Sequence, residues 1–473
     1  MFRQFYHARQ VRPCWGVSVF LLALGSGLAG LARATESTEG SARVSFTREI
    51  APLLAQECLS CHNPEKAKGG YRLDTFDAMM KAGDSGQPPI VPGAPGRSRL
   101  FALVTTTEVE DRMPQKDDPL TATEVALLRR WINEGAGFDG ADRNAPLAEL
   151  TAPRHHPPPP ARYRKPVPVR ALAFHPGDGS LAAGGYHEVT FWNPTNGALL
   201  HRLTNAPQQI HALAFEREGS VLAVAGGAPG RSGELRLFDL RSNAPPRVLL
   251  RTRDVLLTAV FSSDGRRLTA GGTDNTVRMF DVATGRPQFA AEVHGDWITA
   301  LALDGEGRQI VSASRDKTVR LLDSKTGELE LTYVGHTAPV LAVAFSPDGQ
   351  QIASAGRDRE IHLWEAKSGK KLGEIKGFAA DVLRLAWVED RIISGAADGK
   401  ARVHSAKDLK QAPLLMLTGH DTDVTAIALD EARGWLASGS FDGEVRIWNL
   451  SDGTLVTRFI ASPGLRHEDG PRR

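Results

Sequence analysis

The pentapeptide IHLWE, at residues 361–365, decides the fold of most of this chain, because versions of it recur at a fixed interval. The related pentapeptides are VRMFD at 277–281, VRLLD at 319–323 and VRIWN at 445–449. Their fourth residues, at positions 280, 322, 364 and 448, are separated by 42 residues or by twice that number. Internal repetition at such a period is typical of architectures in which each repeat forms one supersecondary unit.

Further features of the repeat predict its structure. Weaker versions around Trp192, Phe238 and His404 complete seven repeats. In five repeats an aspartate lies six residues before the fourth residue of the pentapeptide or, in the weaker repeat, before His404. These residues are Asp274, Asp316, Asp358, Asp398 and Asp442. Upstream lie alternating segments such as 340–345, followed by turns such as Ser-Pro-Asp-Gly at 346–349. Short strands with a signature in every repeat predict an all-β, seven-bladed propeller over residues 167–464, with four strands in each blade.

These repeats resemble those of WD40 propellers. That family buries a hydrogen-bonded network of His, Ser, Asp and Trp inside a blade, which gives each buried polar atom a partner. The resemblance assigns such a structural network to two blades: His336, Ser354, Asp358 and Trp364, and His420, Ser438, Asp442 and Trp448. Other blades depart from the pattern: Leu322 replaces Trp, Phe378 replaces His, and Thr252 and Ala270 replace His and Ser.

The region before the repeats, residues 44–140, has the pattern of a small all-α domain. Ile50, Leu53 and Leu54 share one helical face. Thr121 and Glu124 fit a capping box at the start of a second helix, in which Val125, Leu128 and Ile132 form an apolar stripe flanked by Trp131. Gly135 is suited to the left-handed residue that ends this helix. The Gly- and Pro-rich stretch 83–96 predicts a loop.

A linker over residues 141–166 separates the two regions. His155 and His156 are followed by four prolines, Pro157–Pro160, which favour a stiff, extended spacer. We interpret the two histidines as solvated linker residues, with metal binding as the alternative. After the predicted propeller, which ends at residue 464, we expect a short tail at 465–473.

The first 34 residues have the features of a secretory signal. A basic segment with Arg3, Arg9 and Arg12 precedes an apolar core at 17–24, and Ala-Arg-Ala at 32–34 supplies a cleavage site. We therefore expect an exported, periplasmic protein with no integral membrane span in the mature chain. The alternative is an uncleaved N-terminal anchor, although the apolar stretch from 15 to 31 is short for a span.

The charge of the mature chain gives no reason to expect a nucleic-acid partner. Formal net charge is +2. Four of the 57 basic residues lie in residues 1–34, which contain no acid, so removing them leaves 53 basic against 55 acidic residues. No Ser-His-Asp, paired-carboxylate or metal-hydrolase constellation stands out in the sequence.

The motif CLSCH at residues 58–62 carries the chemistry. Two thiols three residues apart can add to the two vinyl groups of a haem, while the histidine that follows binds the iron. The motif therefore predicts one covalent haem c, attached through Cys58 and Cys61, with His62 as proximal ligand. The alternatives are a zinc site, a thioredoxin-like redox pair and a chance occurrence. A zinc site would need further ligands, and a redox pair would follow a strand rather than a helix.

Met113 is the candidate for the second axial ligand of the iron. It precedes Pro114 in a predicted loop, and a thioether stabilises reduced iron. Met79 and Met80 are the rivals, but their helical spacing from Phe76 suits core packing better.

Residues 44–140 as a whole resemble the planctomycete-type cytochrome c domain. The resemblance rests on the segment 46–57, on the CLSCH motif, and on the sequences GGYRLD at 69–74, GDSG at 83–86, VPG at 91–93, RMP at 112–114 and LLRRWI at 127–132. It implies single-haem chemistry with His62 and Met113 as axial ligands. Gln115 stands where a second proline is common in the family.

The sequence thus predicts a multidomain chain in which a cytochrome c domain precedes a WD40-like propeller. With both axial positions filled, the expected function is single-electron transfer, with the propeller docking a redox partner protein. We do not assign an enzymatic activity, and a non-catalytic carrier or accessory subunit fits better. The alternatives are a haem subunit of an oxidoreductase or peroxidase, and a haem-bearing scaffold or redox sensor.

Overall fold

The computed structural model describes residues 43–59, 61–64, 66–108, 110–115, 119–140, 142–147 and 156–465. The predicted signal at 1–34, His155 and the tail beyond residue 465 lie outside these ranges. Among the described residues, no helix combines the length and apolarity needed to cross a bilayer.

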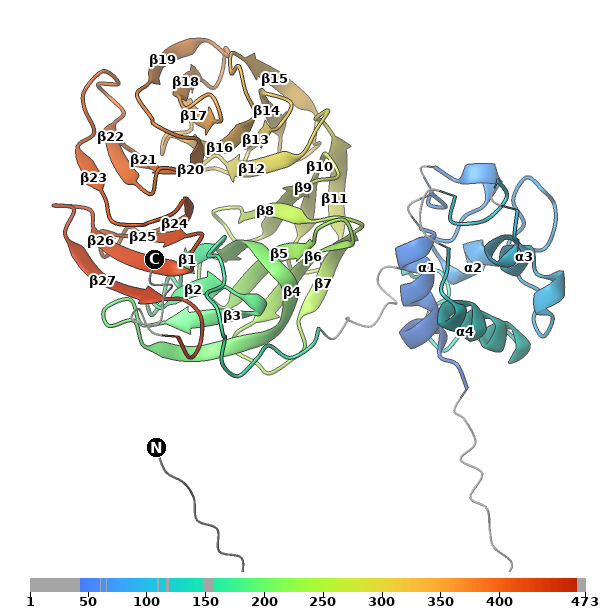
Figure 1. The fold of residues 1–473 in the computed structure, drawn as a ribbon. Helices are drawn as coiled ribbons and strands as arrows, with labels where there is room; N and C mark the ends of the chain where they lie inside the picture. Colours follow the sequence, from blue (N-terminus) through green and yellow to red (C-terminus); the bar gives the residue numbers. More distant parts are fainter. Residues whose placement is uncertain are drawn as a thin grey trace, which may run out of the picture. The chain divides into compact units, whose positions relative to one another are not determined.

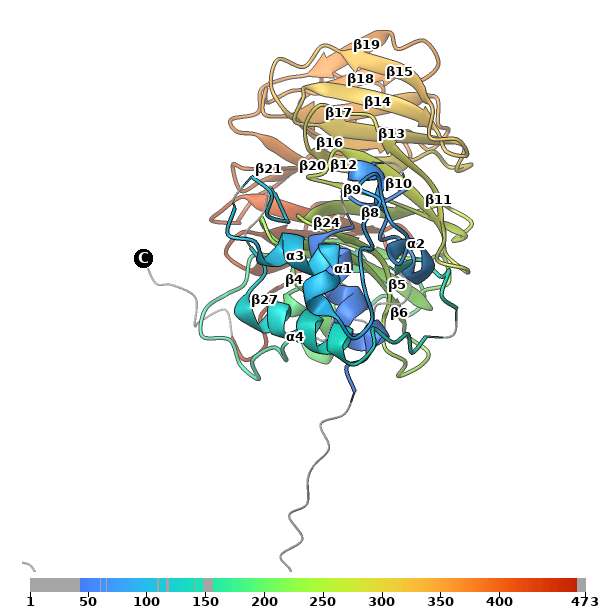
Figure 2. The same ribbon diagram turned by 90° about the vertical axis from the view of Figure 1, so that its right-hand side faces the viewer.

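The first folded region is a small helical body, seen from two sides in Figures 1 and 2. A π-helical turn, η1 (Phe46–Ile50), leads directly into the first helix. The remaining elements are helices and 3₁₀ turns: α1 (Ala51–Glu57), η2 (Lys68–Gly70), α2 (Phe76–Met79), η3 (Pro95–Arg97), α3 (Arg99–Thr105) and α4 (Ala122–Asn133).

Side-chain caps explain where the first and last helical segments begin. The Ser45 hydroxyl accepts the Arg48 amide at 3.1 Å. Both halves of the predicted capping box form at α4, because the Thr121 hydroxyl accepts the Glu124 amide and the Glu124 carboxylate accepts the Thr121 amide. Gly135 ends α4 with φ of +98°, as predicted.

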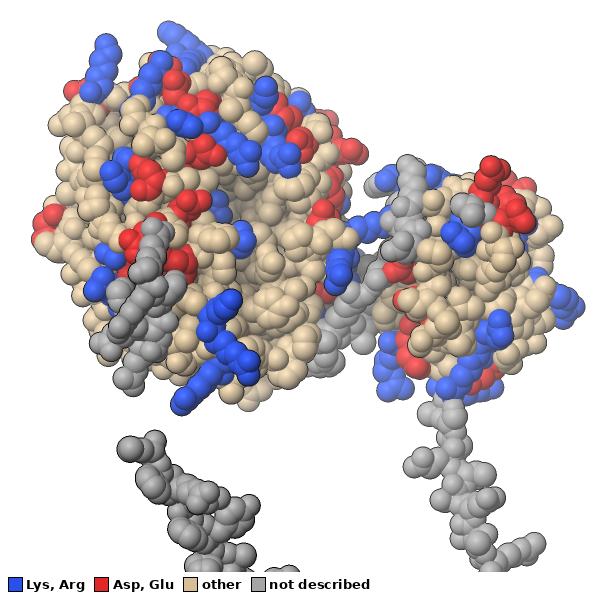
Figure 3. Space-filling view, viewed as in Figure 1, with Lys and Arg blue, Asp and Glu red and all other residues tan. Residues whose placement is uncertain are grey.

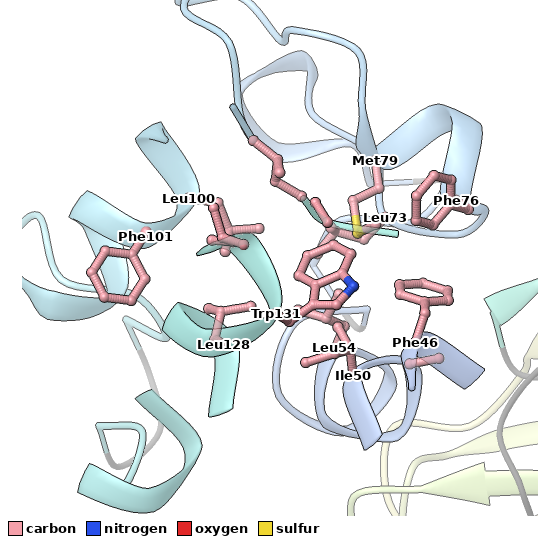
Figure 4. Close-up of a cluster of buried hydrophobic side chains, with 14 of the residues drawn as sticks. Phe46, Ile50, Leu54, Leu73, Phe76, Met79, Leu100, Phe101, Leu128 and Trp131 are labelled. Atoms are coloured by element: carbon pink, nitrogen blue, oxygen red, sulfur yellow. The ribbon is translucent and has the colours of Figure 1, made fainter. Parts of the chain in front are cut away.

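Aromatic rings make up the centre of the helical core (Figure 4). Phe46 packs edge-on against Phe76, with ring centroids 4.8 Å apart, and lies 5.6 Å from the Trp131 ring. The Trp131 indole is buried, and its N–H donates to the Gly137 carbonyl at 3.0 Å. The predicted apolar faces at Leu54 and Leu128 point into this core.

The second region consists of antiparallel sheets arranged around a central axis, visible in Figure 1. The first sheet has seven strands: β1 (Leu172–Phe174), β2 (Leu181–Gly184), β3 (Tyr186–Trp192), β4 (Leu199–Phe215), β5 (Val221–Ala228), β6 (Ser232–Asp239) and β7 (Arg247–Thr252). The early part of β4 pairs with β3 and its later part pairs with β5.

The other sheets each have four strands. The second and third contain β8 (Leu256–Phe261), β9 (Arg267–Gly272), β10 (Thr276–Asp281) and β11 (Pro287–Glu292), then β12 (Ile298–Leu303), β13 (Gln309–Ser314), β14 (Thr318–Asp323) and β15 (Leu329–Val334). The fourth contains β16 (Val340–Phe345), β17 (Gln351–Gly356), β18 (Ile361–Glu365) and β19 (Lys371–Ile375). The last two contain β20 (Val382–Val388), β21 (Arg391–Ala396), β22 (Ala401–Ser405) and β23 (Leu415–Leu417), then β24 (Val424–Asp430), β25 (Trp435–Ser440), β26 (Glu444–Asn449) and β27 (Leu455–Ile460).

The all-β repeat domain is as predicted, but the described strands form six sheets rather than seven separate four-stranded ones. The reason is local, because β4 is 17 residues long and runs unbroken from one set of partners to the next. Elsewhere a turn or loop separates the last strand of one sheet from the first strand of the next.

The predicted hydrogen-bonded network forms in full around His336. The imidazole Nδ1 lies 2.6 Å from an Asp358 oxygen and Nε2 lies 2.7 Å from the Ser354 hydroxyl. The same hydroxyl accepts the Trp364 indole N–H at 2.7 Å. Ser354 therefore joins the histidine of one loop to the tryptophan of β18, inside a blade that excludes water.

The prediction for the last blade is wrong at one position. His420 contacts the Ser438 hydroxyl at 2.7 Å, and Trp448 donates to it at 2.8 Å, as predicted. Asp442, however, bonds to neighbouring residues in its own turn. The Glu444 carboxylate lies 3.2 Å from His420 Nδ1 instead, because the longer side chain reaches the imidazole from β26.

The linker histidine that the structure describes is not a solvated residue, contrary to our interpretation. His156 Nε2 lies 2.9 Å from an oxygen of Glu234, and its ring packs against His187 at 5.0 Å. Glu234 also accepts from the buried Arg236 guanidinium at 2.7 Å. Burial alone would raise the pKa of Glu234, but His156 and Arg236 lower it to about 2. The end of the linker is thus tied to β6.

The Ser354 network predicts a difference between two equivalent serines. We expect Ser354→Ala to lower the free energy of unfolding by about 1–3 kcal/mol, because His336 and Trp364 both lose a buried partner. Ser394 occupies the same register position in β21, yet its hydroxyl is buried with no hydrogen-bond partner. Ser394→Ala should therefore cost clearly less in denaturant unfolding. Equal losses for the two variants would contradict the assigned role of Ser354.

The Glu234 pair predicts a loss of stability in acid. Because folding lowers the pKa of Glu234 from its ordinary 4.5 to about 2, its contribution is present above about pH 4.5 and disappears as the pH falls towards 2. Glu234→Gln should destabilise the protein at neutral pH and flatten the pH dependence of its unfolding free energy between pH 4.5 and 2. The exposed Glu218→Gln is the control. A pH profile of Glu234→Gln identical to that of the wild type would refute this assignment.

Candidate cofactor site

The CLSCH motif forms a tight turn at the end of α1. The Cys58 amide donates to the Leu54 carbonyl at 3.0 Å, which continues the helix into the motif. The amides of Cys61 and His62 both donate to the Cys58 carbonyl at 3.2 Å. This turn carries both thiols and the imidazole on a short, backbone-bonded segment. No disulfide joins the two cysteines.

A hydrogen bond to the backbone determines how His62 presents its ring. His62 Nδ1 lies 3.1 Å from the Tyr71 carbonyl oxygen, which can only accept. Nδ1 therefore carries the hydrogen, and the lone pair of the neutral ring is on Nε2. The His62 carbonyl in turn accepts the Leu73 amide at 2.7 Å, which holds the motif against the segment that follows it. A metal-binding histidine is commonly oriented by such a contact.

The four predicted site residues line one cavity of about 410 Å³, within the size range of cofactor pockets. Cys58, Cys61 and His62 come from the turn after α1, and Met113 comes from the loop after α3. The Met113 amide is bonded to the Leu103 carbonyl at 2.9 Å. The structure thus brings together residues that are up to 55 positions apart in the sequence.

The rival methionines lie elsewhere. Met79 is buried in the core, where the Tyr71 hydroxyl donates to its carbonyl at 2.8 Å. Met80 packs against the same core. Among the described residues that line the cavity, Met113 is the one methionine. The arrangement therefore favours Met113 over both rivals.

The sequence analysis missed the helix that forms an apolar wall of the cavity. Leu100, Leu103 and Val104 of α3 line it, alongside Leu73. Their spacing of i, i+3 and i+4 is a helical stripe that could have been read from the sequence. Seven residues is short for a helix, and the Gly- and Pro-rich stretch before it obscures its start.

The surroundings of the thiols argue against the alternative interpretations of the motif. Burial, followed by the neighbouring Glu57, raises the pKa of Cys58 to about 12, whereas a redox-active thiol has a lowered pKa. Groups of three or more potential metal ligands converging on one point occur, within the described part of the chain, only in the propeller. Cys58, Cys61 and His62 are therefore spread around the cavity instead of meeting at one ion, as a zinc site requires.

Two family models match the chain, one in each region. The model described as Planctomycete cytochrome C matches residues 58–117. The model described as WD domain, G-beta repeat matches residues 251–281, 285–323, 327–365 and 411–449. The chain is thus a fusion of a cytochrome c-type domain with a WD40-repeat domain, as the sequence predicted. A cytochrome c-type domain implies haem binding.

Curated relatives each match less than a quarter of the chain. The mitotic checkpoint protein BUB3.1 of Arabidopsis thaliana is 35% identical over 86 residues, which are 18% of this chain and 24% of the relative. The WD repeat-containing protein VIP3 of Arabidopsis thaliana is 31% identical over 23% of this chain and 37% of its own length. The target of rapamycin complex subunit LST8 of Mus musculus is 30% identical over 20% and 29%. The matched part is well under half the length of each relative.

Proposed function

We propose that this protein is an exported c-type cytochrome that binds one haem covalently and transfers single electrons. The observation that carries the proposal is the convergence of Cys58, Cys61, His62 and Met113 on one apolar-walled cavity. A cavity with two thiols, an oriented imidazole and a thioether fits a covalently held haem in both size and donor set. When bound, the haem supplies one-electron chemistry.

Each residue of the site has a distinct role in this proposal. Cys58 and Cys61 form the two thioethers, and His62 offers Nε2 as the proximal ligand. The Tyr71 carbonyl keeps the imidazole in the tautomer that this ligation needs. Met113 supplies the distal thioether. The apolar side chains of α3 would lie against the haem and lower the polarity of its surroundings, which favours the less charged, reduced iron.

Two axial ligands of the iron, His62 and Met113, favour an electron carrier over an enzyme. A peroxidase or an oxygen-activating oxidoreductase needs an open or displaceable ligand position. Met113, which lines the same cavity as His62, would fill that position as the distal ligand. A haem-containing oxidoreductase subunit, or a scaffold that senses redox state, remains the second candidate. Rapid reaction of the oxidised protein with cyanide or peroxide would favour the enzyme, while slow reaction supports the carrier.

The propeller supplies the docking surface for a redox partner in this proposal. We infer that the seven-stranded sheet corresponds to two blades joined through β4, so that the domain has seven blades. The support is the switch of partners along β4: residues 199–204 pair with β3, Gln209 pairs with both β3 and β5, and the residues after it pair with β5 alone. WD40 domains bind other proteins, and the family match extends that expectation to this chain.

Export completes the proposal. The signal-like segment at residues 1–34 supports transport to the periplasm, and covalent haem attachment takes place outside the cytoplasm.

Removal of the thiols tests the attachment. We expect the wild type, purified under denaturing conditions, to retain haem absorbance, since thioethers survive unfolding. Cys58→Ala with Cys61→Ala should lose that absorbance completely. Cys14→Ala is the matched control, because Cys14 lies in the signal-like segment, and it should leave the haem content unchanged. Haem content of the double variant equal to that of the wild type would reject the proposed attachment.

The distal ligand is tested by methionine variants. Met113→Ala should convert the ferric iron from low spin to high spin and lower the reduction potential, because the thioether that favours reduced iron is lost. Met80→Ala is the control, since Met80 packs against the core and does not line the cavity. If Met80→Ala changed the spin state and Met113→Ala did not, the ligand assignment would be wrong.

A further inference from the structure

The strands that surround the propeller axis have a common pattern of pairing with the next strand of their own sheet. These strands are β1, β4, β8, β12, β16, β20 and β24, and residues from all of them line a cavity of about 180 Å³. From β4 onward, each pairs with the next strand of its sheet through a register shift, which lies near the start of the strand in β8, β12, β16, β20 and β24 and in the later part of β4. The residue that follows the shift is small in most strands: Ala212, Thr258, Ala300, Ala342 and Ala426.

Arg384 occupies this small-residue position in β20. Its guanidinium donates to the Leu383 carbonyl at 2.8 Å and to the Arg170 carbonyl at 3.4 Å. Arg170 precedes β1, which belongs to a different sheet, so the Arg384 side chain extends across the axial cavity. Arginine thus stands at a position where most of the equivalent strands have alanine.

The axial cavity gathers basic groups without an acid. Arg170, His211 and Arg384 line it, and none of its lining residues within the described chain is Asp or Glu. The Arg170 guanidinium lies over the Phe441 ring, 5.5 Å from its centroid. His211 Nε2 is buried with no hydrogen-bond partner. By contrast, acidic and basic side chains both occur, close to one another, on the face of the propeller that Figure 3 shows.

The proximity of these groups is electrostatically unfavourable. Burial and the nearby Arg170 lower the pKa of Arg384 to about 10. Burial and the two guanidiniums lower the pKa of His211 to about 4. Backbone carbonyls and a ring face reduce this cost only in part, because they carry no net charge. A bound anion would relieve the repulsion and satisfy the unpartnered nitrogen.

We propose that the propeller axis is a binding site for a single oxyanion, a carboxylate or phosphate group, held between Arg170 and Arg384 with a hydrogen bond from His211 Nε2. Guanidiniums suit this ligand because their planar N–H donors match the oxygens of both groups. A cavity of about 180 Å³ is smaller than the ~300–1,000 Å³ typical of cofactor pockets, so it suits one anionic group. The site goes beyond the proposed electron transfer, because it consists only of propeller residues.

Two sources of the oxyanion are distinguished by titration of the full-length protein at constant ionic strength. One arm uses inorganic phosphate, and the other uses a blocked peptide of glutamates as a model for an acidic segment of a docked protein. Calorimetry should show saturable binding in at least one arm. Binding of phosphate alone identifies a free anion, whereas binding of the peptide alone identifies a protein carboxylate. Absence of saturable binding in both arms overturns the proposal.

Arg384→Ala tests the site, since alanine is the residue at most equivalent positions and should preserve the fold. It should weaken binding about tenfold or more, the loss expected for a charge-assisted hydrogen bond. Arg308→Ala, at a solvent-exposed arginine in an ion pair with Glu306, is the control and should bind like the wild type. If thermal unfolding shows that Arg384→Ala is not folded, Arg170→Gln provides the same test. Affinity equal to the wild type in a folded variant would show that the arginines have only a structural role at the axis, and would overturn the proposal.

Discussion

The hydrogen bond between His62 Nδ1 and the Tyr71 carbonyl constrains what the helical domain can bind. It leaves Nε2 as the only basic nitrogen of the imidazole and holds the ring beside the two thiols. The rest of the domain supports this contact. The aromatic core around Trp131 positions α1 and α4, and α1 ends at the motif. One backbone carbonyl, nine residues beyond the histidine, therefore decides which nitrogen of His62 is free to bind a metal.

Sequence reasoning succeeded where a local rule decides the structure. Helix capping at Thr121, the left-handed stop at Gly135 and the repeat period of the propeller depend on neighbouring residues or on repetition. It also named four residues that the fold places around one cavity. Their roles as haem ligands remain predictions, because spacing and position indicate a donor set without the bound group.

The errors have a common cause in tertiary contacts. Glu444 takes the place predicted for Asp442, because a side chain longer by one methylene reaches His420 from the strand. His156 leaves the expected solvated linker because Glu234 and Arg236 form a buried charge pair that it completes. Residue spacing alone decides neither contact, since each depends on which side chain the fold brings within reach. The continuous strand β4 likewise depends on how two repeats join in space.

The two regions differ in the kinds of side chain that line their cavities. The helical domain concentrates soft donors and apolar walls, which suit a redox cofactor. The propeller holds His294, His336 and His420 in hydrogen-bonded networks that stabilise their blades. Its axis is the exception, because basic side chains there face a cavity with no acid among its described lining residues. We therefore propose electron transfer as the function of the first region and recognition as the function of the second.

The central claim is that both thiols of the CLSCH motif are bonded to one haem. The most direct measurement is the mass of the proteolytic peptide that contains residues 58–62, taken from the purified protein. We expect a single peptide carrying one haem, with neither thiol accessible to alkylation. A peptide of bare polypeptide mass, with its thiols alkylated or joined as a disulfide, would contradict it.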